Sequence, residues 1–228
     1  VMSPSNLDFF KNTKQDISKF EVLYNWSEIP DIQESTDTFR KKLNLEKKIV
    51  LFYGGNIGHA QKMIILVDLA KYLANKPEVH FLFVGKGDEV DLILDEVEKH
   101  KLENVTYLPS VDQNTYFEML NEFDIGLFSL HPDHKTHNFP GKLLGYMAYS
   151  KPILGCVNKG NDLKDIVNNT KAGVIVDSDS ENELRQAAKS LIDSENVRKE
   201  MGANGRLLLS QLFSVKNACL QIEKALEK

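Results

Sequence analysis

The stretches that decide the fold are residues 49–58, IVLFYGGNIG, and residues 79–87, VHFLFVGKG. Each is a run of apolar, mostly β-branched or aromatic residues that ends in glycines, which is typical of a buried strand followed by a tight turn. Between them, residues 60–73 place apolar side chains three and four positions apart, and this spacing predicts a helix. The order strand, helix, strand predicts two parallel strands joined by a crossover helix.

The same alternation continues along the chain. Further strands are predicted at residues 105–108, 125–128, 152–156 and 174–176, and further helices at 88–100, 112–122, 141–149 and 162–168, with a short extra strand at 22–24. Asp88 is predicted to cap the helix that follows it. Apolar strands alternating with helices predict the α/β class, with a Rossmann-like, doubly wound parallel sheet of about six strands. Such sheets bind ligands at the carboxyl ends of their strands, so functional residues are expected in the loops after residues 53, 84, 108 and 128.

The composition argues against several classes of protein. The 228 residues carry 28 Lys and Arg against 33 Asp and Glu, a net charge of −5, whereas nucleic-acid binders normally have a basic excess. No apolar run approaches the roughly 20 residues that span a bilayer, and no secretory signal opens the chain. We therefore expect a cytoplasmic protein, with the inner face of the membrane as the alternative for a longer enzyme. Cys156 and Cys219 are expected to be reduced thiols, with a disulfide as the alternative.

The first glycine-rich loop is suited to phosphate. Gly54, Gly55 and Gly58 allow a ligand to approach the backbone closely, and the start of the next helix offers unpaired N–H groups. The loop is not a dinucleotide-binding fingerprint, because Asn56 and His59 occupy two of its glycine positions, and no Gly-Lys-Ser/Thr follows as in a P-loop. An ordinary tight turn remains the alternative.

The loop after residue 128 is longer than usual and leads into Pro140, Gly141 and Lys142 at a predicted helix start. A lysine in the first turn of a helix is unfavourable unless an anion lies there, so this position predicts a pyrophosphate site, with a solvated lysine at the end of a loop as the alternative. The loop also carries His131, His134 and His137. We expect them to face solvent or a sugar, with a zinc site as the less favoured alternative.

Four motifs in this order carry a family resemblance: YGGNIGHAQ, VGKGDE, LPSV and NFPGKLLGYMAYSKPI. They resemble the C-terminal, donor-binding domain of group 1 (retaining) GT-B glycosyltransferases, most similar to the branch that makes bacterial capsule and O-antigen (lipopolysaccharide) polysaccharides. The resemblance covers residue 20 to the C-terminus. It implies a transferase that moves a sugar from a UDP- or GDP-linked nucleotide-sugar donor to a glycan or lipid-linked acceptor with retention, using no cofactor or metal.

The resemblance also implies roles for particular residues. Lys142 matches the lysine that neutralises the diphosphate and is the expected catalytic group. The expected donor-binding residues are, for the diphosphate, Gly55, Asn56, Ile57, Gly141 and Leu143; for the base, Gly85 and Val111; and for the donor sugar, His137 and Asn138. Relatives place Arg and Lys where Asn56 and Gln61 stand, and two Glu where His137 and Gly145 stand. The second Glu holds the ribose, so no ribose ligand is assigned.

On this interpretation residues 1–20 are a remnant of the N-terminal domain and linker, and residues 21–228 form the donor-binding domain. The partners would be the donor and the missing N-terminal domain, which would carry the acceptor site and any peripheral membrane contact. The isolated fragment would be inactive. Three alternatives stay open: a GT-B nucleotide-sugar epimerase, a non-catalytic nucleotide-binding module, and a flavodoxin-like regulatory domain, which would need acidic residues where the first strand ends in glycines.

Overall fold

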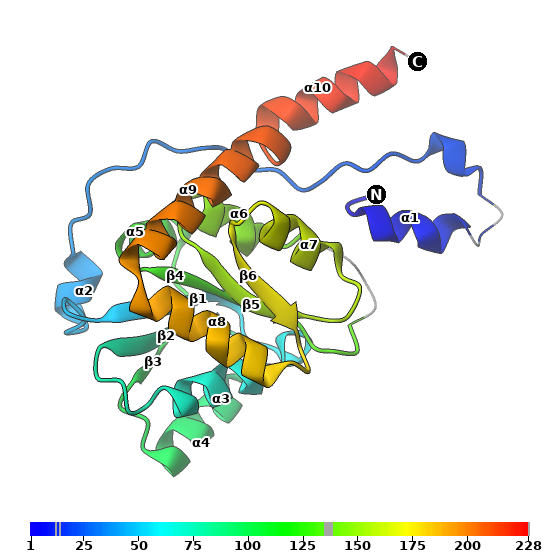
Figure 1. The fold of residues 1–228 in the computed structure, drawn as a ribbon. Coiled ribbons are helices and arrows are strands. Elements are labelled where there is room, and N and C mark those ends of the chain that lie inside the picture. Colours follow the sequence, from blue (N-terminus) through cyan, green and yellow to red (C-terminus); the bar gives the residue numbers. More distant parts are fainter. Residues whose placement is uncertain (12, 14, 135–138, 228) are drawn as a thin grey trace.

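The fold is a parallel sheet covered by helices on both faces (Figure 1). The computed structural model describes residues 1–11, 13, 15–134 and 139–227. Within them six strands pair in the order β3-β2-β1-β4-β5-β6, all parallel. The strands are β1 Ile49–Asn56, β2 Val79–Lys86, β3 Val105–Pro109, β4 Ile125–Ser129, β5 Ile153–Val157 and β6 Gly173–Asp177. This order confirms the predicted Rossmann-like sheet and differs from the order 2-1-3-4-5 of flavodoxin-like domains.

Each face of the sheet has its own hydrophobic core. On one face Val50 and Phe52 pack with the helices α5 Gln113–Glu122, α6 Gly141–Ala148, α7 Asp162–Asn169 and α9 Glu195–Leu212. On the other face Leu51 and Tyr53 pack with α3 Ile64–Tyr72, α4 Val90–His100 and α8 Glu181–Asp193. Because neighbouring side chains of a strand point to opposite faces, a strand buried on both faces is apolar throughout. This is why β1 and β2 begin as nearly continuous hydrophobic runs, at residues 49–53 and 79–84.

Three local predictions were wrong. Asp88 does not cap α4, because its carboxylate accepts a hydrogen bond from the backbone N–H of His59, at 3.1 Å, in the facing loop. The helix predicted from residue 60 begins at Ile64, after a 3-10 turn over His59–Gln61 and a left-handed residue, Lys62. Residues 22–24 form no strand, because no neighbouring strand pairs with them among the described residues.

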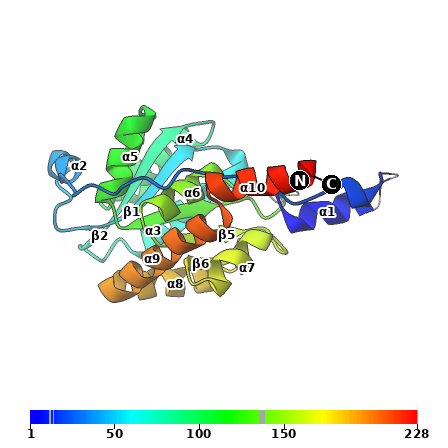
Figure 2. The same cartoon turned by 90° about the horizontal axis from the view of Figure 1, so that it is seen from above.

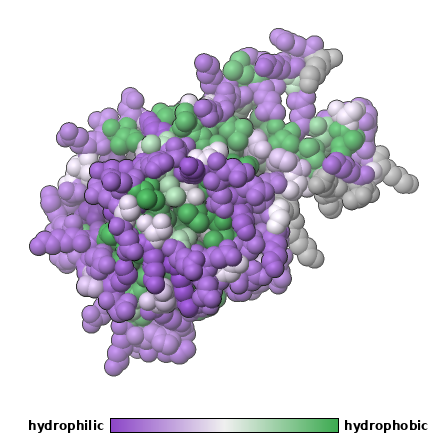
Figure 3. Space-filling view, in the orientation of Figure 1, coloured by the Kyte–Doolittle hydropathy of each residue, from purple (hydrophilic) through white to green (hydrophobic). Residues whose placement is uncertain are grey.

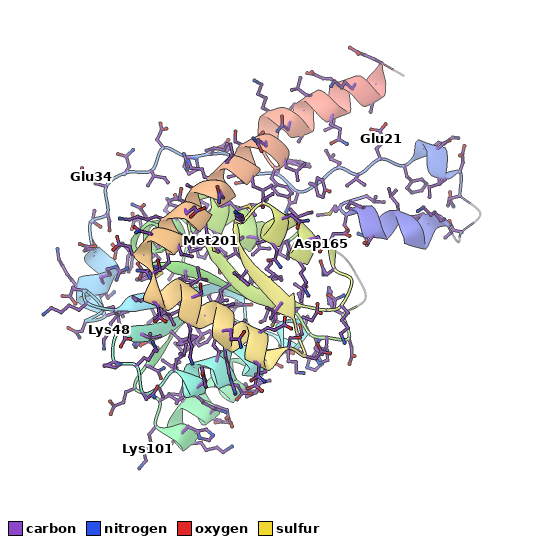
Figure 4. All side chains as sticks on the ribbon, in the orientation of Figure 1. Glu21, Glu34, Lys48, Lys101, Asp165 and Met201 are labelled. Carbon is purple, nitrogen blue, oxygen red and sulfur yellow. The ribbon has the colours of Figure 1, made fainter. Side chains whose placement is uncertain are left out.

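The segments at the two ends of the chain lie beside each other and project from the body (Figures 1 and 2). The segment before β1 includes α1 Pro4–Lys11, the 3-10 turn Ile17–Lys19 and α2 Thr38–Lys42, and the C-terminal helix is α10 Val215–Leu226. The N–H of Ser27 donates to the Phe213 carbonyl at 2.9 Å, and the Tyr24 ring meets the Phe213 ring edge-on. Glu21 and Glu34, labelled in Figure 4, lie on this segment outside the sheet and its covering helices.

The surface of these projecting segments is more apolar than that of the lower body (Figure 3). Exposed hydrophobic side chains there are Met2, Ile17, Val215, Leu220, Ile222 and Leu226. No helix among the described residues is both long and apolar enough to cross a membrane. The two thiols are unpaired, with Cys156 buried in β5 and Cys219 exposed on α10.

A single buried tyrosine fixes α6 against the sheet. The Tyr146 side chain is fully buried, and its hydroxyl donates to the Leu127 carbonyl at 3.0 Å and accepts from the Gly54 N–H at 3.4 Å. Its ring lies flat against Gly126 of β4, where a Cβ atom would stand 2.4 Å from the ring. Residues on β1 and β4 therefore set the position of α6 and of the residues in its first turn.

Gly126→Ala should lower the free energy of unfolding by about 1–3 kcal/mol, because the added methyl group would displace the Tyr146 ring from a packed core. Urea unfolding of the two chains measures the difference. Gly141→Ala is the matched control, since its Cβ would meet no atom closer than 3.9 Å and should leave the stability nearly unchanged. Equal stability of Gly126→Ala and wild type would contradict the proposed anchoring.

Candidate functional site

A cleft opens where two neighbouring strands of the sheet separate. The ladder between β1 and β4 ends at the pair Phe52 and Gly126, whereas the ladder between β1 and β2 continues to Asn56 and Lys86. Beyond Phe52, the side chains of Tyr116 from α5 and Lys142 from α6 approach Gly54 and Gly55 of β1. The change in strand order that Rossmann-like sheets use for ligand binding thus lies at the glycine-rich end of β1.

The cleft has two compartments that share Gly55, Gln113 and Tyr116. We call the first, of about 420 Å³, the Trp26 compartment; its other lining residues are Asn25, Trp26, Ser27, Gly54, Phe117, Gly141, Lys142, Leu144 and Gly145. We call the second, of about 400 Å³, the Val111 compartment; its other lining residues are Asn56, Val84, Gly85, Lys86, Ser110 and Val111. Although the chain is acidic overall, the described lining residues include two lysines and no carboxylate.

Lys142 has an unusual environment at the meeting point of the compartments. Its ammonium lies 3.7 Å from the centre of the Tyr53 ring, and its Nζ atom is buried without a hydrogen-bond partner among the described residues. Burial lowers the pKa of Lys142 from 10.5 to about 7. The face of the Tyr53 ring attracts the cation and partly offsets that effect. A buried cation with no hydrogen-bond acceptor is suited to receive an anion.

The backbone around Lys142 leaves room for such an anion. Gly55 has a positive φ of 126°, and a Cβ there would lie 3.4 Å from both Cε and Nζ of Lys142. Gly141 and Lys142 are in the first turn of α6, where backbone N–H groups have no acceptor within the helix and the helix dipole favours negative charge. The glycines of β1 and the start of α6 therefore face one another across the ammonium.

Most of the predicted site residues line this cleft. Lys142, Gly55 and Gly141 line the Trp26 compartment, and Asn56, Gly85 and Val111 line the other. At Gly85 the backbone itself lines the cleft, and a side chain would not fit there, because its Cβ would overlap the Gly55 carbonyl oxygen. His137 and Asn138 lie outside the described residues.

Two predicted residues do not offer their N–H groups to the cleft. The Ile57 N–H donates to the Lys86 carbonyl at 2.9 Å, and the Leu143 N–H donates to the Pro140 carbonyl at 3.1 Å. Both side chains are fully buried. Ile57 and Leu143 thus shape the loop and the helix start from below the cleft.

Asn56 and Gln61, where the resemblance led us to expect cations, pair with each other. The Asn56 side-chain amide donates to the Gln61 side-chain oxygen at 2.7 Å. On the far side of the same loop, the rings of His59 and His131 lie 5.0 Å apart, with Glu89 3.6 Å from His59. The described residues contain no group of three or more side chains suited to hold a metal ion.

Other wall residues of the cleft were not predicted. Asn25, Trp26 and Ser27 come from the segment before β1, and Gln113, Tyr116 and Phe117 come from the first turns of α5. The helix after residue 112 was expected at the correct place, so its aromatic pair, Tyr116 and Phe117, was the available signal. Nothing in the sequence places residues 25–27 beside α6.

The comparisons with known proteins agree with this geometry. The family described as "Glycosyl transferases group 1" matches residues 35–208. The chain belongs to the group 1 glycosyltransferase family. An uncharacterized glycosyltransferase of Methanocaldococcus jannaschii is 23% identical over 226 residues, which are 97% of this chain and 55% of that protein.

Two further relatives extend the comparison. The N-acetylgalactosamine-N,N'-diacetylbacillosaminyl-diphospho-undecaprenol 4-alpha-N-acetylgalactosaminyltransferase of Campylobacter jejuni is 22% identical over 86% of this chain and 51% of its own length. The crystal structure of Anabaena HepE in complex with UDP and glucose superposes with a TM-score of 0.82 at 19% identity, covering 99% of this chain and 61% of HepE. This likeness shows the GT-B type of Rossmann-like fold. The chain spans about half the length of the first two curated relatives.

Replacing Lys142 by Met should stabilise the ligand-free protein by about 1–3 kcal/mol near pH 7, because it removes a buried cation for which residues 1–134 and 139–227, as far as described, offer no hydrogen-bond partner. The amine has a pKa of about 7 in the folded chain and about 10.5 when unfolded, so the folded chain binds fewer protons between these values. Wild-type stability therefore rises over this window, and the advantage of Lys142→Met should be largest at pH 7 or below and vanish above about pH 10.5. Urea unfolding of both chains at pH 6, 8 and 10 measures it.

Lys151→Met is the matched control for this experiment. Burial also lowers the pKa of Lys151, to about 8, but its Nζ donates to the Asn121 carbonyl at 2.9 Å. Lys151→Met should therefore lose a hydrogen bond and gain less stability than Lys142→Met. If Lys142→Met is less stable than wild type at pH 6, the ammonium has a partner in solution and our description of it is wrong.

Proposed function

We propose that this chain binds the donor of a retaining glycosyltransferase, a UDP- or GDP-linked nucleotide-sugar, and holds its diphosphate at Lys142. The observation that carries the proposal is the buried Lys142 ammonium, which has no hydrogen-bond partner among the described residues and faces Gly55 and the start of α6. HepE, whose structures similar to this chain contain UDP and UDP-glucose, supports a nucleotide-sugar as the ligand.

Under this proposal the two compartments hold the two organic groups on either side of the diphosphate. The Val111 compartment, lined by backbone at Gly85 and by Val111, would take the base. The donor sugar would lie toward the loop that contains His137 and Asn138. No cofactor is required, because Lys142 and backbone N–H groups would supply the positive charge.

The chemistry would be glycosyl transfer. The bond between the anomeric carbon and the diphosphate oxygen breaks, an acceptor hydroxyl forms the new bond to that carbon, and its proton is released. Negative charge grows on the departing nucleoside diphosphate, where Lys142 and the N–H groups of α6 are already oriented to stabilise it. Protonation of Lys142 strengthens as an anion approaches, because the anion offsets the cost of burying the ammonium.

We further propose that another domain of the full-length enzyme supplies the acceptor site and any contact with the inner face of the membrane. The chain spans about half of its curated relatives, and exposed hydrophobic side chains on the projecting segments, such as Ile17 and Leu220, offer a surface for such a domain. The acceptor would be a glycan or a lipid-linked sugar, as in polysaccharide synthesis. The Campylobacter relative, whose name includes a diphospho-undecaprenol substrate, supports this class.

One observation favours the second candidate, a nucleotide-binding module without catalysis. The cations and the second glutamate expected from the family are replaced by the Asn56–Gln61 pair and by Gly145. Both candidates require a diphosphate at Lys142. They differ in whether the full-length protein transfers or hydrolyses the sugar of a bound donor.

Titration calorimetry of the chain with UDP, GDP, ADP and CMP tests the binding site. We expect a nucleoside diphosphate to bind, and Lys142→Ala to weaken that binding about 10- to 150-fold, because a hydrogen bond to a charged group contributes about 1.5–3 kcal/mol. The single tryptophan of the chain, Trp26, lines the cleft, so its fluorescence gives a second readout. Lys151→Ala is the control and should bind as wild type does.

Two results would overturn the assignment. One is the absence of binding by any of the four nucleotides at millimolar concentration. The other is unchanged affinity in Lys142→Ala. Glycosyl transfer by the 228-residue chain alone would instead contradict the proposal that a further domain carries the acceptor site.

A further inference from the structure

Tyr116 stands at the junction of the two compartments and has no role in the function proposed above. It lies one turn into α5, and its ring packs against Phe52 with centroids 5.7 Å apart. The ring also presses on Gly54, where a Cβ would overlap it. Of the residues shared by both compartments, Tyr116 contributes the aromatic surface, and Gly55 and Gln113 are the other two.

The hydroxyl of Tyr116 is a second polar group without a protein partner in this cleft. It is buried and makes no hydrogen bond of normal geometry with any described residue. The hydroxyl of Tyr146 is near enough to influence its pKa, yet that hydroxyl donates to the Leu127 carbonyl and accepts from the Gly54 N–H. Buried hydroxyls without a partner are rare and costly, so one that lines a cleft points to a ligand that completes its hydrogen bonding.

Gly145 lies beside this buried hydroxyl and, like Tyr116, lines the Trp26 compartment. A Cβ at position 145 would lie 3.9 Å from the Tyr116 oxygen and 3.3 Å from Leu120, so a larger side chain would crowd the hydroxyl. A ligand group that reaches the hydroxyl would therefore pass next to a residue without a side chain. A phenol suits a sugar hydroxyl, because it both donates and accepts and adds no charge beside the diphosphate.

We propose that the Tyr116 hydroxyl binds a sugar hydroxyl next to the diphosphate, either on the ribose or on the sugar to be transferred. This inference rests on the proposed function, since it takes the position of the diphosphate at Lys142 as given. It assigns to Tyr116 and Gly145 the recognition of a hydroxyl group for which the sequence offered no ligand.

The test is Tyr116→Phe, measured by calorimetry with UDP, 2′-deoxy-UDP, 3′-deoxy-UDP, UDP-glucose and inorganic pyrophosphate (GDP or ADP compounds replace these if they bind more tightly). We expect about 3- to 10-fold weaker binding of UDP-glucose, the range for one neutral hydrogen bond, and unchanged binding of pyrophosphate. If the affinity for UDP falls by the same factor, the contact is to the ribose. The deoxy-UDP that lacks the contacted hydroxyl should then bind to wild type and to Tyr116→Phe with the same affinity. If only the affinity for UDP-glucose falls, the contact is to the transferred sugar.

The thermal midpoint separates this role from a structural one. Tyr116→Phe should leave the midpoint unchanged or slightly raised, because the hydroxyl makes no hydrogen bond in the part of the chain that the structure describes. Tyr72→Phe, on α3 and outside the cleft, is the matched control and should bind every ligand as wild type does. Gly145→Ala should also lower the affinity for UDP-glucose and should leave the affinity for pyrophosphate unchanged.

Three outcomes would overturn the inference. The first is unchanged binding of both UDP and UDP-glucose by Tyr116→Phe. The second is a loss of affinity for pyrophosphate equal to that for UDP-glucose, which would mean that the substitution distorts the Lys142 site. The third is a lowered thermal midpoint together with a loss of affinity for every ligand. If wild type binds no nucleotide and no pyrophosphate, the proposed function fails and this inference fails with it. If wild type binds these ligands and Tyr116→Phe binds them equally well, only the inference is overturned.

Discussion

The contact between the Lys142 ammonium and the Tyr53 ring depends on, and connects, the other elements of the cleft. A cation buried without a hydrogen-bond partner among the described residues is costly, and several elements fix it in place here. Gly55 keeps the space above it clear, and Tyr146 holds the helix that carries it against β1 and β4. Burial of the ammonium thus lowers the stability of the ligand-free protein. An anion bound beside Lys142 would offset this cost, and the free energy recovered would add to the affinity for the anion.

The sheet makes this arrangement possible through its strand order. Because β1 and β4 part after Phe52, the first turns of α5 and α6 reach the end of β1 from the same face. A side chain at Gly54 would collide with Tyr116, and one at Gly55 would press on Lys142. The glycines at the end of β1 therefore leave room for the side chains of Tyr116 and Lys142 as well as for a ligand. Both need the space that a side chain at position 54 or 55 would fill.

Hydrophobic periodicity was enough to predict the sheet, its covering helices and the strand ends where the site lies, since each of these depends on neighbouring residues in the chain. Lys142 was singled out by a different local signal, a positive charge in a first helical turn, where the helix dipole disfavours it. Contacts between distant segments could not be predicted. The Ile57 N–H donates to the Lys86 carbonyl, and the Asp88 carboxylate accepts from the His59 N–H in the facing loop. Residues 25–27, far away in the sequence, line the cleft together with α6.

Local charge, and not the charge of the whole chain, decides what the cleft can bind. The chain carries a net charge of −5, yet the described lining residues contain Lys142 and Lys86 and no carboxylate. A glutamate at position 145 would add a negative charge one helical turn from Lys142, in a site where charges are weakly screened. Position 145 is a glycine instead, and the neutral phenol of Tyr116 lies beside it. At Asn56 and Gln61 the side chains are neutral as well and bond to each other. Around Lys142 the described lining of the Trp26 compartment therefore consists of uncharged residues.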